Sequence, residues 1–491
     1  MKKIIILLTV SIATLFGAFI AYEIPAVREG VSKLMPLELK KLIKHNLFIV
    51  SYQKEQIAAR ESEIRLLEKE LQSKNDELEK NIQDKFFQDL SVGAVKTWPL
   101  LAPIYTQSKN SLLLERAEAK KIVASDNERY TLNAFPLPFL PPALAHGYKP
   151  LFYIDSTESK IVLITGEGVV FMFDKNDINK PILKLDTIPS NIRSMIVDKS
   201  LYEPSWFSIK DLYIDNNSAY ISYNKKVGDN YTLGVLVAEL NSEKLEFKEF
   251  FTLPDSVDTG GKFNAHQLGG RIVKYKDKTL LISSGDMSKW EKAQDDNTLL
   301  GKIFSIDIET KETQIISKGH RNPQGLFYDE QTGVIFSTEH GPNGGDEINL
   351  NLNKEDSNRN FGWPMASYGL HYDSRFHENA PLHKSHKDHG YQEPLKQYTP
   401  SVGPSEIIKV PNRFKRNFRN DYFTAIMGLN HSLPIQSLHH FRMSADYSKI
   451  DHESVIVIGE RIRDIHSLNS KQILLALEGN GTPAIGILSS D

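Results

Sequence analysis

The sequence contains no cysteine among its 491 residues. This absence excludes a disulfide framework, a thiolate metal site and the Cys-x-x-Cys-His attachment of a c-type haem. It is compatible with an oxidising compartment but does not require one.

An excess of charge of either sign is also lacking. Lys and Arg number 59 against 62 Asp and Glu, which gives a net charge of −3. A nucleic-acid-binding surface needs a basic excess, so nucleic acid is not expected as a partner. No Gly-rich dinucleotide fingerprint lies on a strand–helix–strand pattern, and NAD and FAD are therefore not expected either.

Long apolar runs are missing apart from one, Ile4–Ala21, which follows Lys2 and Lys3. It lies at the lower edge of a membrane span and exceeds the usual core of a signal peptide. No clean small-x-small cleavage site follows, so we predict an uncleaved anchor in residues 1–25, with a signal peptide as the alternative. Because the lysines stay inside in both cases, we predict a periplasmic or other extracytoplasmic domain, anchored to the inner membrane.

Residues 26–129 are predicted to form a helical spacer. Its segment Tyr52–Phe87 contains no Gly or Pro, and four apolar residues repeat there every seven positions: Ile57, Ile64, Leu71 and Leu78. This repeat predicts a short coiled coil that makes a homo-oligomer. Three other seam positions are polar, namely Arg60, Lys74 and Asn81. A solvated single helix therefore remains the alternative.

Residues 130–491 read as short β-like runs between turn residues, with few helical stripes. Clear examples are Leu151–Ile154, Ile161–Thr165, Val169–Phe173, Ser218–Tyr223, Leu233–Glu239, Thr279–Ser283, Lys302–Ile306, Val455–Gly459 and Gln472–Leu477. Regularly spaced strands predict an all-β sandwich, barrel or propeller. A length of about 360 residues suits six four-stranded blades of about 60 residues each.

The most informative stretch is Gly319–Leu350. Alternating apolar positions predict a hairpin there, Gly325–Asp329 and Val334–Thr338, joined by a turn at Glu330–Gly333. Arg321 and Asn322 flank one end, and a glycine-rich acidic loop, Glu339–Glu347, flanks the other.

The loop Glu339–Glu347 has the composition of a ligand site. Glycine lets the backbone approach a ligand closely, and the bend at Gly341-Pro342 exposes two carbonyl oxygens. Beside Asp346 and Glu347, these oxygens suit a hard cation such as calcium. A tight polar turn without a ligand is the alternative.

This stretch resembles the signature of the soluble pyrroloquinoline-quinone (PQQ)-dependent aldose sugar dehydrogenases, the glucose/sorbosone dehydrogenase family. Further segments match in the family's order: Asn264–Ile272, Ser284–Asp286, Asn360–Pro364, Pro400–Ser405 and Arg461–Ile465. The resemblance implies a six-bladed β-propeller of four-stranded blades. It also implies an exported quinoprotein that oxidises an aldose at C1 to the lactone, by hydride transfer to Ca²⁺-bound PQQ.

The resemblance assigns the catalytic roles to His266 and Asp286. His266 would be the general base that removes the sugar hydroxyl proton, a role that suits a side chain titrating near working pH. Asp286 would lie beside the substrate and orient His266. Capping of a turn remains the alternative for Asp286.

PQQ carries three carboxylates, so its site needs fixed cations. Arg321, Arg461 and Arg463 supply planar donor forks that suit carboxylates. Arg461 and Arg463 are expected to alternate on a strand and to point the same way. By resemblance, Asn322 donates a hydrogen bond to the quinone.

The resemblance also assigns the metal ligands. Gly341 and Pro342 would offer backbone oxygens to the calcium that bridges protein and cofactor. Asp346 would hold the water shell of that ion, and Glu347 would bind a second, structural calcium. The bridging ion would polarise the quinone carbonyl as a Lewis acid.

Three positions depart from the family pattern. The family's cofactor-binding lysine is missing from the run Tyr422–Asn430. Thr399 replaces an aromatic residue, although Tyr398 is adjacent, and Glu406 replaces a glycine. Loss of one cation and one ring predicts weaker PQQ binding than is usual in the family.

Two further questions stay open in the sequence. A loop rich in histidine contains His371, His377, His383, His386 and His389, and a polar insertion is favoured there over a zinc or copper site. The alternative function is a catalytically inactive, membrane-tethered propeller that binds glycans or proteins. Calcium-dependent lactone hydrolysis is less favoured, because it would not need the three arginines. The sequence specifies neither the sugar nor the electron acceptor.

Overall fold

A computed structural model describes Trp98 and residues 100–140, 151–196, 209–258, 267–354, 359–370, 383–415, 418–428, 436–478 and 482–491. All of them belong to one compact unit, Phe86–Asp491. Among these residues no helix is long and apolar enough to cross a membrane. The predicted membrane segment, the predicted coiled coil and His266 lie outside the described residues and stay predictions.

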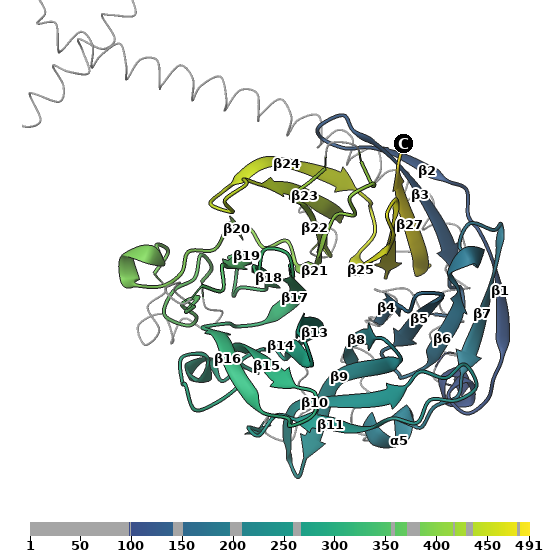
Figure 1. Ribbon diagram of the computed structural model, residues 1–491, viewed down its shortest axis with the longest axis horizontal. Coiled ribbons are helices and arrows are strands. Elements are labelled where there is room, and N and C mark those ends of the chain that lie inside the picture. The colour runs from purple at the N-terminus through teal and green to yellow at the C-terminus, as the bar shows by residue number, and fades with distance from the viewer. Residues whose placement is uncertain are drawn as a thin grey trace, which may run out of the picture. The chain divides into compact units, whose positions relative to one another are not determined.

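The described residues form six antiparallel sheets arranged as blades around a central axis (Figure 1). Blade 1 has the strand order β1-β7-β6-β5-β4, and blade 2 has the order β11-β10-β9-β8 with β12 paired to β10. Blades 3, 4 and 5 run in chain order as β13–β16, β17–β20 and β21–β24, and blade 6 has the order β2-β3-β27-β26-β25. The predicted six-bladed propeller is confirmed, with a fifth strand added in blades 1, 2 and 6.

The elements have the following bounds. Blades 1 and 2 contain β1 (Ser111–Glu115), β4 (Phe152–Ser156), β5 (Lys160–Thr165), β6 (Val170–Asp174), β7 (Ile182–Ile188), β8 (Ile209–Asp215), β9 (Ser218–Val227), β10 (Asn230–Glu239), β11 (Lys248–Thr252) and β12 (Val257–Asp258). Blades 3 and 4 contain β13 (Gly269–Lys276), β14 (Thr279–Ser284), β15 (Lys302–Asp307), β16 (Thr313–Lys318), β17 (Pro323–Tyr328), β18 (Ile335–Glu339), β19 (Asp346–Asn351) and β20 (Lys396–Tyr398). Blades 5 and 6 contain β21 (Pro404–Lys409), β22 (Asp421–Ile426), β23 (Ser437–Met443), β24 (Ile450–Val457), β2 (Lys120–Val123), β3 (Arg129–Pro136), β25 (Ile462–Asn469), β26 (Gln472–Leu477) and β27 (Ala484–Ser490). Short helices are η2 (Lys175–Asp177), α5 (Ile192–Ile196), η4 (Trp290–Ala293) and η6 (Lys387–His389).

The blades pack on one another through apolar clusters, one between each pair of neighbours in the described ring. Alternate residues of a strand point to opposite faces, so a blade between two neighbours needs apolar residues at successive positions. In β14, Leu280 and Ile282 pack toward blade 2, whereas Leu281 packs toward blade 4. This two-sided burial explains why the inner parts of the blades read as continuous apolar runs.

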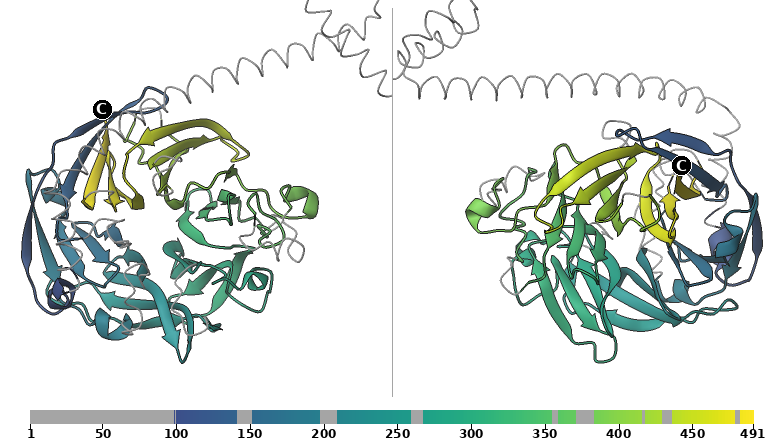
Figure 2. Two further views of the ribbon diagram at one scale, coloured as in Figure 1. Left: turned by 180° about the vertical axis from the view of Figure 1, so that it is seen from behind. Right: turned by 45° about the horizontal axis from the view of Figure 1, so that its top comes forward.

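The ring is closed by a strand from the beginning of the propeller. β3 pairs along its length with β27, so that Tyr130 lies opposite Ser490. In Figures 1 and 2 the C-terminus accordingly lies beside β3. β1 pairs with β7 and β2 pairs with β3, so residues 111–123 belong to the propeller. The predicted boundary at residue 130 is therefore wrong, because β1 and β2 are short and largely exposed edge strands without a clear apolar alternation.

Arg271 on β13 lies at the centre of the ring with 4% of its surface exposed. Its guanidinium pairs with carboxylates from three other blades: Asp211 at 2.8 Å, Glu406 at 2.9 Å and Asp464 at 2.9 Å. It donates to the backbone oxygens of Gln324 at 2.7 Å and Arg463 at 3.2 Å. The guanidinium also lies 5.2 Å from the centre of the Tyr153 ring on β4. Arg271 thus contacts all the other inner strands, namely β4, β8, β17, β21 and β25.

Candidate functional site

The predicted site residues gather at one end of the inner strands. Arg321 and Asn322 directly precede β17, and Arg461 directly precedes β25. Asp286 and Gly341 follow β14 and β18, the second strands of their blades. In an antiparallel blade, the entry to the first strand and the exit from the second lie at the same end. These residues therefore share one face of the propeller.

Asp286 is buried and connects several of the matched segments. Its carboxylate accepts hydrogen bonds from the Ser288 amide at 2.8 Å and from the Trp363 indole Nε1 at 2.7 Å. With its amide oxygen facing Arg321, Gln267 donates to Asp286 at 2.7 Å and accepts from Arg321 at 3.0 Å. Burial raises the pKa of Asp286 to about 7, although the charge of Arg321 opposes the shift. The contact with Ser288 is the turn cap named as the alternative, and it coexists with the contacts across the site.

His266 itself lies outside the described residues, but its neighbour Gln267 lies between Asp286 and Arg321. Gln267 and Trp363 belong to segments that matched in sequence, yet no role was predicted for either. Their contacts depend on pairings between blades, which a single sequence does not contain.

Arg321 joins the hairpin to the calcium loop predicted above. Its Nη1 donates to the backbone oxygens of His340 at 2.8 Å and Gly341 at 2.7 Å. Its guanidinium carbon lies 5.5 Å from the Trp363 ring centre, within the range of a cation–π contact. The guanidinium is thereby held flat beside the loop, as recognition of a planar carboxylate requires.

The side chain of Asn322 is oriented by hydrogen bonds to its amide oxygen. Its Oδ1 accepts from Gln324 Nε2 at 2.9 Å and from the Gly269 amide at 3.4 Å. Since these contacts use the oxygen, Nδ2 is the group that can donate to a ligand. This orientation fits the predicted hydrogen bond to a quinone oxygen.

Arg461 and Arg463 are held by one buried carboxylate. Glu478 is 0% exposed, and it accepts from Arg461 Nε at 3.2 Å and from Arg463 Nε at 2.6 Å. Arg461 precedes β25 rather than lying within it, but both guanidinium groups turn to the same side, as predicted. Two arginines share one carboxylate, so the pair keeps a net positive charge. Burial lowers the pKa of His340, Asp346 opposes the shift, and the charges of Arg463 and Arg321 add to it.

Lys210 on β8 is a further cation beside this pair that the sequence analysis missed. Its side chain lies against Gly270 of the next inner strand, where a Cβ atom would come within 2.5 Å of Lys210 Cβ. Burial, and after it the charge of Arg463, lower the pKa of Lys210 to about 7. No carboxylate among the described residues forms an ion pair with Lys210. The available signal was the charged pair Lys210-Asp211 between the apolar residues Ile209 and Leu212 at the start of a strand.

The glycine-rich loop is held in shape by Asp346, which is 2% exposed. Its carboxylate accepts from the backbone amides of Gly341 at 3.1 Å, Val402 at 2.8 Å and Gly403 at 2.7 Å. A Cβ atom on Gly341 would come within 2.1 Å of the Gly345 oxygen, so the fold needs glycine there. The carbonyl of Gly341 has a second lone pair for a cation besides its contact with Arg321. The bend Gly341-Pro342 therefore fits the predicted calcium.

Glu347 lies in β19, where it pairs with Glu339 of β18, so the predicted loop Glu339–Glu347 is shorter than expected. Burial raises the pKa of Glu347, and the charge of Glu339 raises it further. Asn349 donates to both carboxylates, at 3.2 Å and 3.3 Å. Within the described part of the chain, the buried Asn349 Oδ1 and both ring nitrogens of His386 have no hydrogen-bond partner. Two adjacent buried carboxylates and an unpaired amide oxygen fit the predicted second calcium.

Two departures from the family pattern have structural explanations. Glu406 is a partner of the central Arg271. Tyr398 packs in the apolar cluster between blades 4 and 5, and its hydroxyl lies 3.1 Å from His439 Nδ1. Tyr398 is thus used in the core, and Trp363 is the aromatic residue that contacts Arg321.

The histidine-rich loop is described only from His383 onward. The His383 and His389 rings stack with centres 3.4 Å apart, whereas His386 is buried beside Glu347, with Nε2 and Oε1 3.6 Å apart. His371 and His377 lie outside the described residues.

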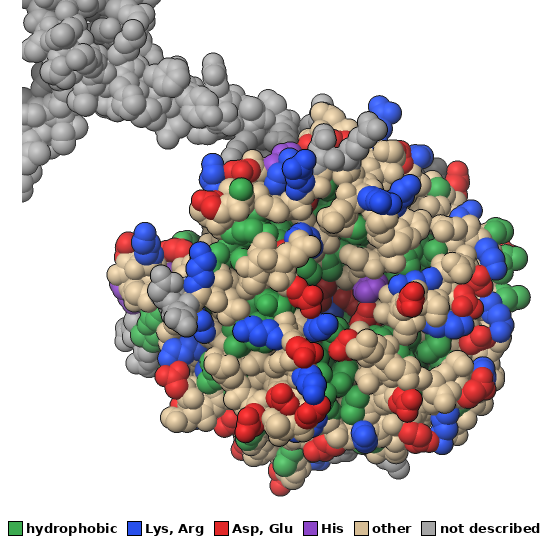
Figure 3. Space-filling model, in the orientation of Figure 1, with side chains coloured by type: hydrophobic (Ala, Val, Ile, Leu, Met, Phe, Trp, Pro, Cys, Tyr) green, Lys and Arg blue, Asp and Glu red, His purple; other side chains and the backbone are tan. Residues whose placement is uncertain are grey.

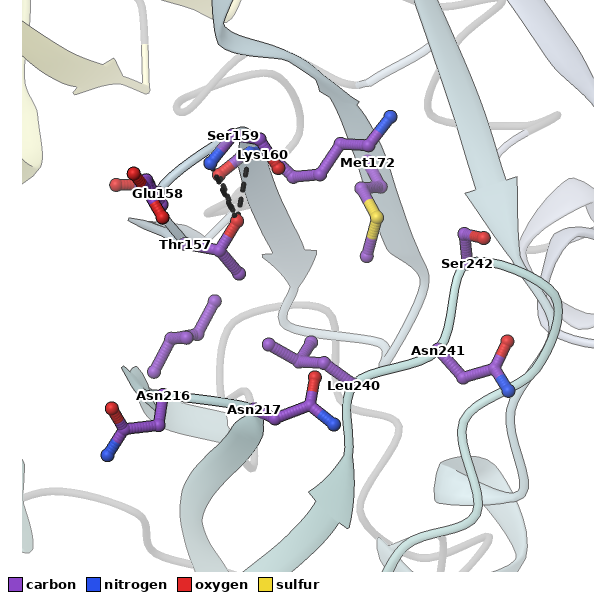
Figure 4. Close-up of a pocket in the computed structure, with 12 residues that line it drawn as sticks. Thr157, Glu158, Ser159, Lys160, Met172, Asn216, Asn217, Leu240, Asn241 and Ser242 are labelled. Carbon is purple, nitrogen blue, oxygen red and sulfur yellow. Dashed lines mark hydrogen bonds between the residues drawn. The ribbon is translucent and has the colours of Figure 1, made fainter.

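The propeller face seen in Figure 1 is hollowed at its centre, and acidic, basic and histidine side chains surround the hollow (Figure 3). A separate pocket of about 550 Å³ lies between the β4–β5 turn, the β8–β9 turn and the loop after β10 (Figure 4). These turns follow the first strands of blades 1 and 2, at the end opposite the candidate site. None of the predicted site residues lines this pocket.

Comparisons with known proteins identify the family of this chain. Residues 207–485, more than half of the chain, match the family described as Glucose / Sorbosone dehydrogenase. The chain is 30% identical over 178 residues to Aldose sugar dehydrogenase YliI of Escherichia coli strain K12, over 33% of this chain and 45% of that protein. It is 28% identical over 169 residues to Quinoprotein glucose dehydrogenase B of Acinetobacter calcoaceticus, over 28% of this chain and 32% of that protein.

Each of these two matches therefore spans less than half of the relative's length. Among solved structures, the soluble aldose sugar dehydrogenase of Escherichia coli in its apo-form has a TM-score of 0.54 at 17% identity. That match covers 78% of this chain and 100% of the other, and it is a similarity of fold.

Proposed function

Because the chain belongs to the glucose / sorbosone dehydrogenase family, we propose that it is an exported PQQ-dependent dehydrogenase that oxidises an aldose at C1 to the lactone. The observation that carries this proposal is the convergence of Arg321, Asn322 and Asp286 with the calcium loop at one end of the propeller. When bound, PQQ accepts the hydride, and calcium polarises the accepting carbonyl.

The residues present fit the anionic cofactor. Arg461 and Arg463 share a single carboxylate, Glu478, and the charge of Arg463 also acts on Lys210, so positive charge is left for cofactor carboxylates. Arg321 would bind another carboxylate with a guanidinium already fixed by His340 and Gly341. Asn322 Nδ2 would donate to a quinone oxygen. Such fixed donors bind without reorganisation, which favours affinity.

His266 would take the proton from the C1 hydroxyl as the hydride leaves. Its neighbour Gln267 is fixed on both sides, by Asp286 and Arg321. Asp286 would act through Gln267 and Trp363 rather than through a free carboxylate oxygen, because its oxygens already accept from these groups.

Reconstitution tests the proposal directly. Purified protein, freed of calcium with a chelator, is expected to bind PQQ only after calcium is restored, and then to reduce a dye acceptor with an aldose. The experiment measures PQQ binding by absorbance and turnover with a panel of aldoses. A folded propeller that binds no PQQ at high calcium would contradict the proposal and favour a binding protein.

The variant Lys210→Met is expected to weaken PQQ binding by about 10-fold or more, the worth of one charge-assisted hydrogen bond. Only the protonated lysine attracts a carboxylate, so wild-type affinity should fall as pH rises through about 7, the pKa of Lys210. The variant should lose that part of the pH dependence. Binding titrations at pH 6 and pH 9 measure both effects.

The matched control for Lys210→Met is Lys278→Met, since Lys278 lies on the surface in an ion pair with Glu309. It should leave PQQ affinity unchanged at both pH values. Equal affinities of wild type and Lys210→Met across this range would show that Lys210 does not contact the cofactor.

A further inference from the structure

A cluster of metal-ligating side chains lies far from the candidate site, on the outermost strand pair of blade 5. His440 on β23, His452 on β24 and Asp126 in the turn between β2 and β3 direct ligand atoms to one point, all within 4.8 Å of one another. β2 contacts β24 at this place, so the cluster bridges blade 5 and the ring-closing sheet of blade 6. The candidate site on the propeller face uses none of these three residues.

His440 is oriented by a carboxylate behind its ring. Its Nε2 lies 2.7 Å from Asp421 Oδ1, and that carboxylate also accepts from Arg442 Nε at 3.0 Å. Because a carboxylate only accepts, Nε2 carries the proton and Nδ1 keeps its lone pair. Nδ1 lies 3.1 Å from Ser454 Oγ, on the side of the cluster. A carboxylate behind a histidine in this way is the usual support of a metal-binding imidazole.

Asp126 and His452 complete the cluster from the side open to solvent. Asp126 Oδ2 lies 3.1 Å from His452 Nε2, whereas its Oδ1 accepts from the Glu128 amide at 3.2 Å and so fixes the turn. The His440 side chain is 0% exposed, the Asp126 side chain 16% and the His452 side chain 38%. An ion therefore has an entry path, and the partly exposed His452 can adjust to it.

We propose that His440 Nδ1, His452 Nε2 and an Asp126 carboxylate oxygen bind a zinc ion, with water as the fourth ligand. Two imidazoles and a carboxylate suit zinc, whereas calcium prefers oxygen ligands alone. Bonds of about 2.1 Å to a tetrahedral ion place ligand atoms ~3.4 Å apart, so the present separations need only small side-chain movements. The bound ion ties the β2–β3 turn to β24 and stabilises the closed ring.

The test uses the full chain in calcium-containing buffer after treatment with a chelator selective for transition metals. Isothermal titration with ZnCl₂ should show one equivalent bound at this site, and zinc should raise the melting temperature. Co²⁺ in place of zinc should give the visible absorption of a tetrahedral site. His452→Ala should weaken zinc binding at least 10-fold and abolish both the cobalt spectrum and the thermal shift.

The matched control is His389→Ala, which removes an exposed histidine from η6 in the histidine-rich loop. It should leave the zinc affinity, the cobalt spectrum and the thermal shift of the cluster unchanged. Zinc binding that is lost in His389→Ala and kept in His452→Ala would place the ion in that loop and overturn the proposal. A wild-type protein that binds no zinc would overturn it as well.

Discussion

Replacing His266 with alanine is expected to abolish turnover and to leave PQQ binding nearly intact. A general base contributes about 10²- to 10⁴-fold to the rate, and it acts in the transition state rather than in cofactor binding. The decrease should therefore appear in kcat, measured with a dye acceptor on protein reconstituted with calcium and PQQ. The cofactor dissociation constant of the same preparation should stay close to that of the wild type.

Arg461→Ala is expected to have the opposite effect, on PQQ binding rather than on turnover. Loss of this guanidinium removes a partner for a cofactor carboxylate, so PQQ affinity should fall, while turnover at saturating PQQ should fall less. His389→Ala, on the exposed η6 helix, should change neither quantity. If His266→Ala retained wild-type kcat, His266 would not be the base. If it lost PQQ binding instead, its role would be in holding the cofactor.

Replacing Arg271 with methionine is expected to cost about 3–5 kcal/mol of unfolding free energy, the range for removing one partner of a buried ion-pair network. The variant leaves Asp211, Glu406 and Asp464 buried together without a cation. Burial already raises the pKa values of Asp211 and Glu406, and Arg271 opposes that shift. Urea denaturation followed by tryptophan fluorescence measures the loss.

The pH dependence of this loss has a definite sign. In the variant the pKa values of Asp211 and Glu406 rise further, because Arg271 no longer opposes the effect of burial, so the folded state binds more protons than the unfolded state does. Its unfolding free energy then falls as pH rises, and the deficit relative to wild type should be larger at pH 8 than at pH 5. A deficit independent of pH would show that lost packing, and not unpaired charge, is the cause.

Lys274→Met is the control for Arg271→Met, because Lys274 lies on the same strand β13 with its side chain 50% exposed, 3.7 Å from Glu330. A surface pair of this kind is worth about 0–1 kcal/mol. Equal costs for the two variants would contradict a structural role for the central arginine.

The blades could be predicted from sequence because their strands are buried on both faces. Thr279–Ser283 and Gln472–Leu477 read as unbroken apolar runs for this reason, and both are strands within a residue of the predicted bounds. The hairpin of blade 4 was recognisable from its turn, since Gly333 adopts a positive φ of 77° between β17 and β18.

The partners of the site residues could not be predicted, because they come from other strands. Glu478 holds Arg461 and Arg463 from the end of β26, and nothing in the sequence pairs these positions. Lys210, on which the charge of Arg463 acts, comes from blade 2, and the role of Glu406 appears only when Arg271 is in place. The edge strands β1 and β2 were missed because one exposed face and short length leave little periodicity to read.

The pairing of β3 with β27 has a consequence for how the chain folds. Residues Tyr130 and Ser490 lie opposite each other in this pairing, so the last sheet forms only when nearly the whole domain has been synthesised. Contacts of such sequence separation slow folding, because the loop between them must be ordered first. Until β27 arrives, β3 and β26 present open sheet edges that can pair with other chains. A nascent propeller of this design should therefore depend on chaperones until its final strand is in place, and a chain lacking β27 should aggregate rather than fold partially.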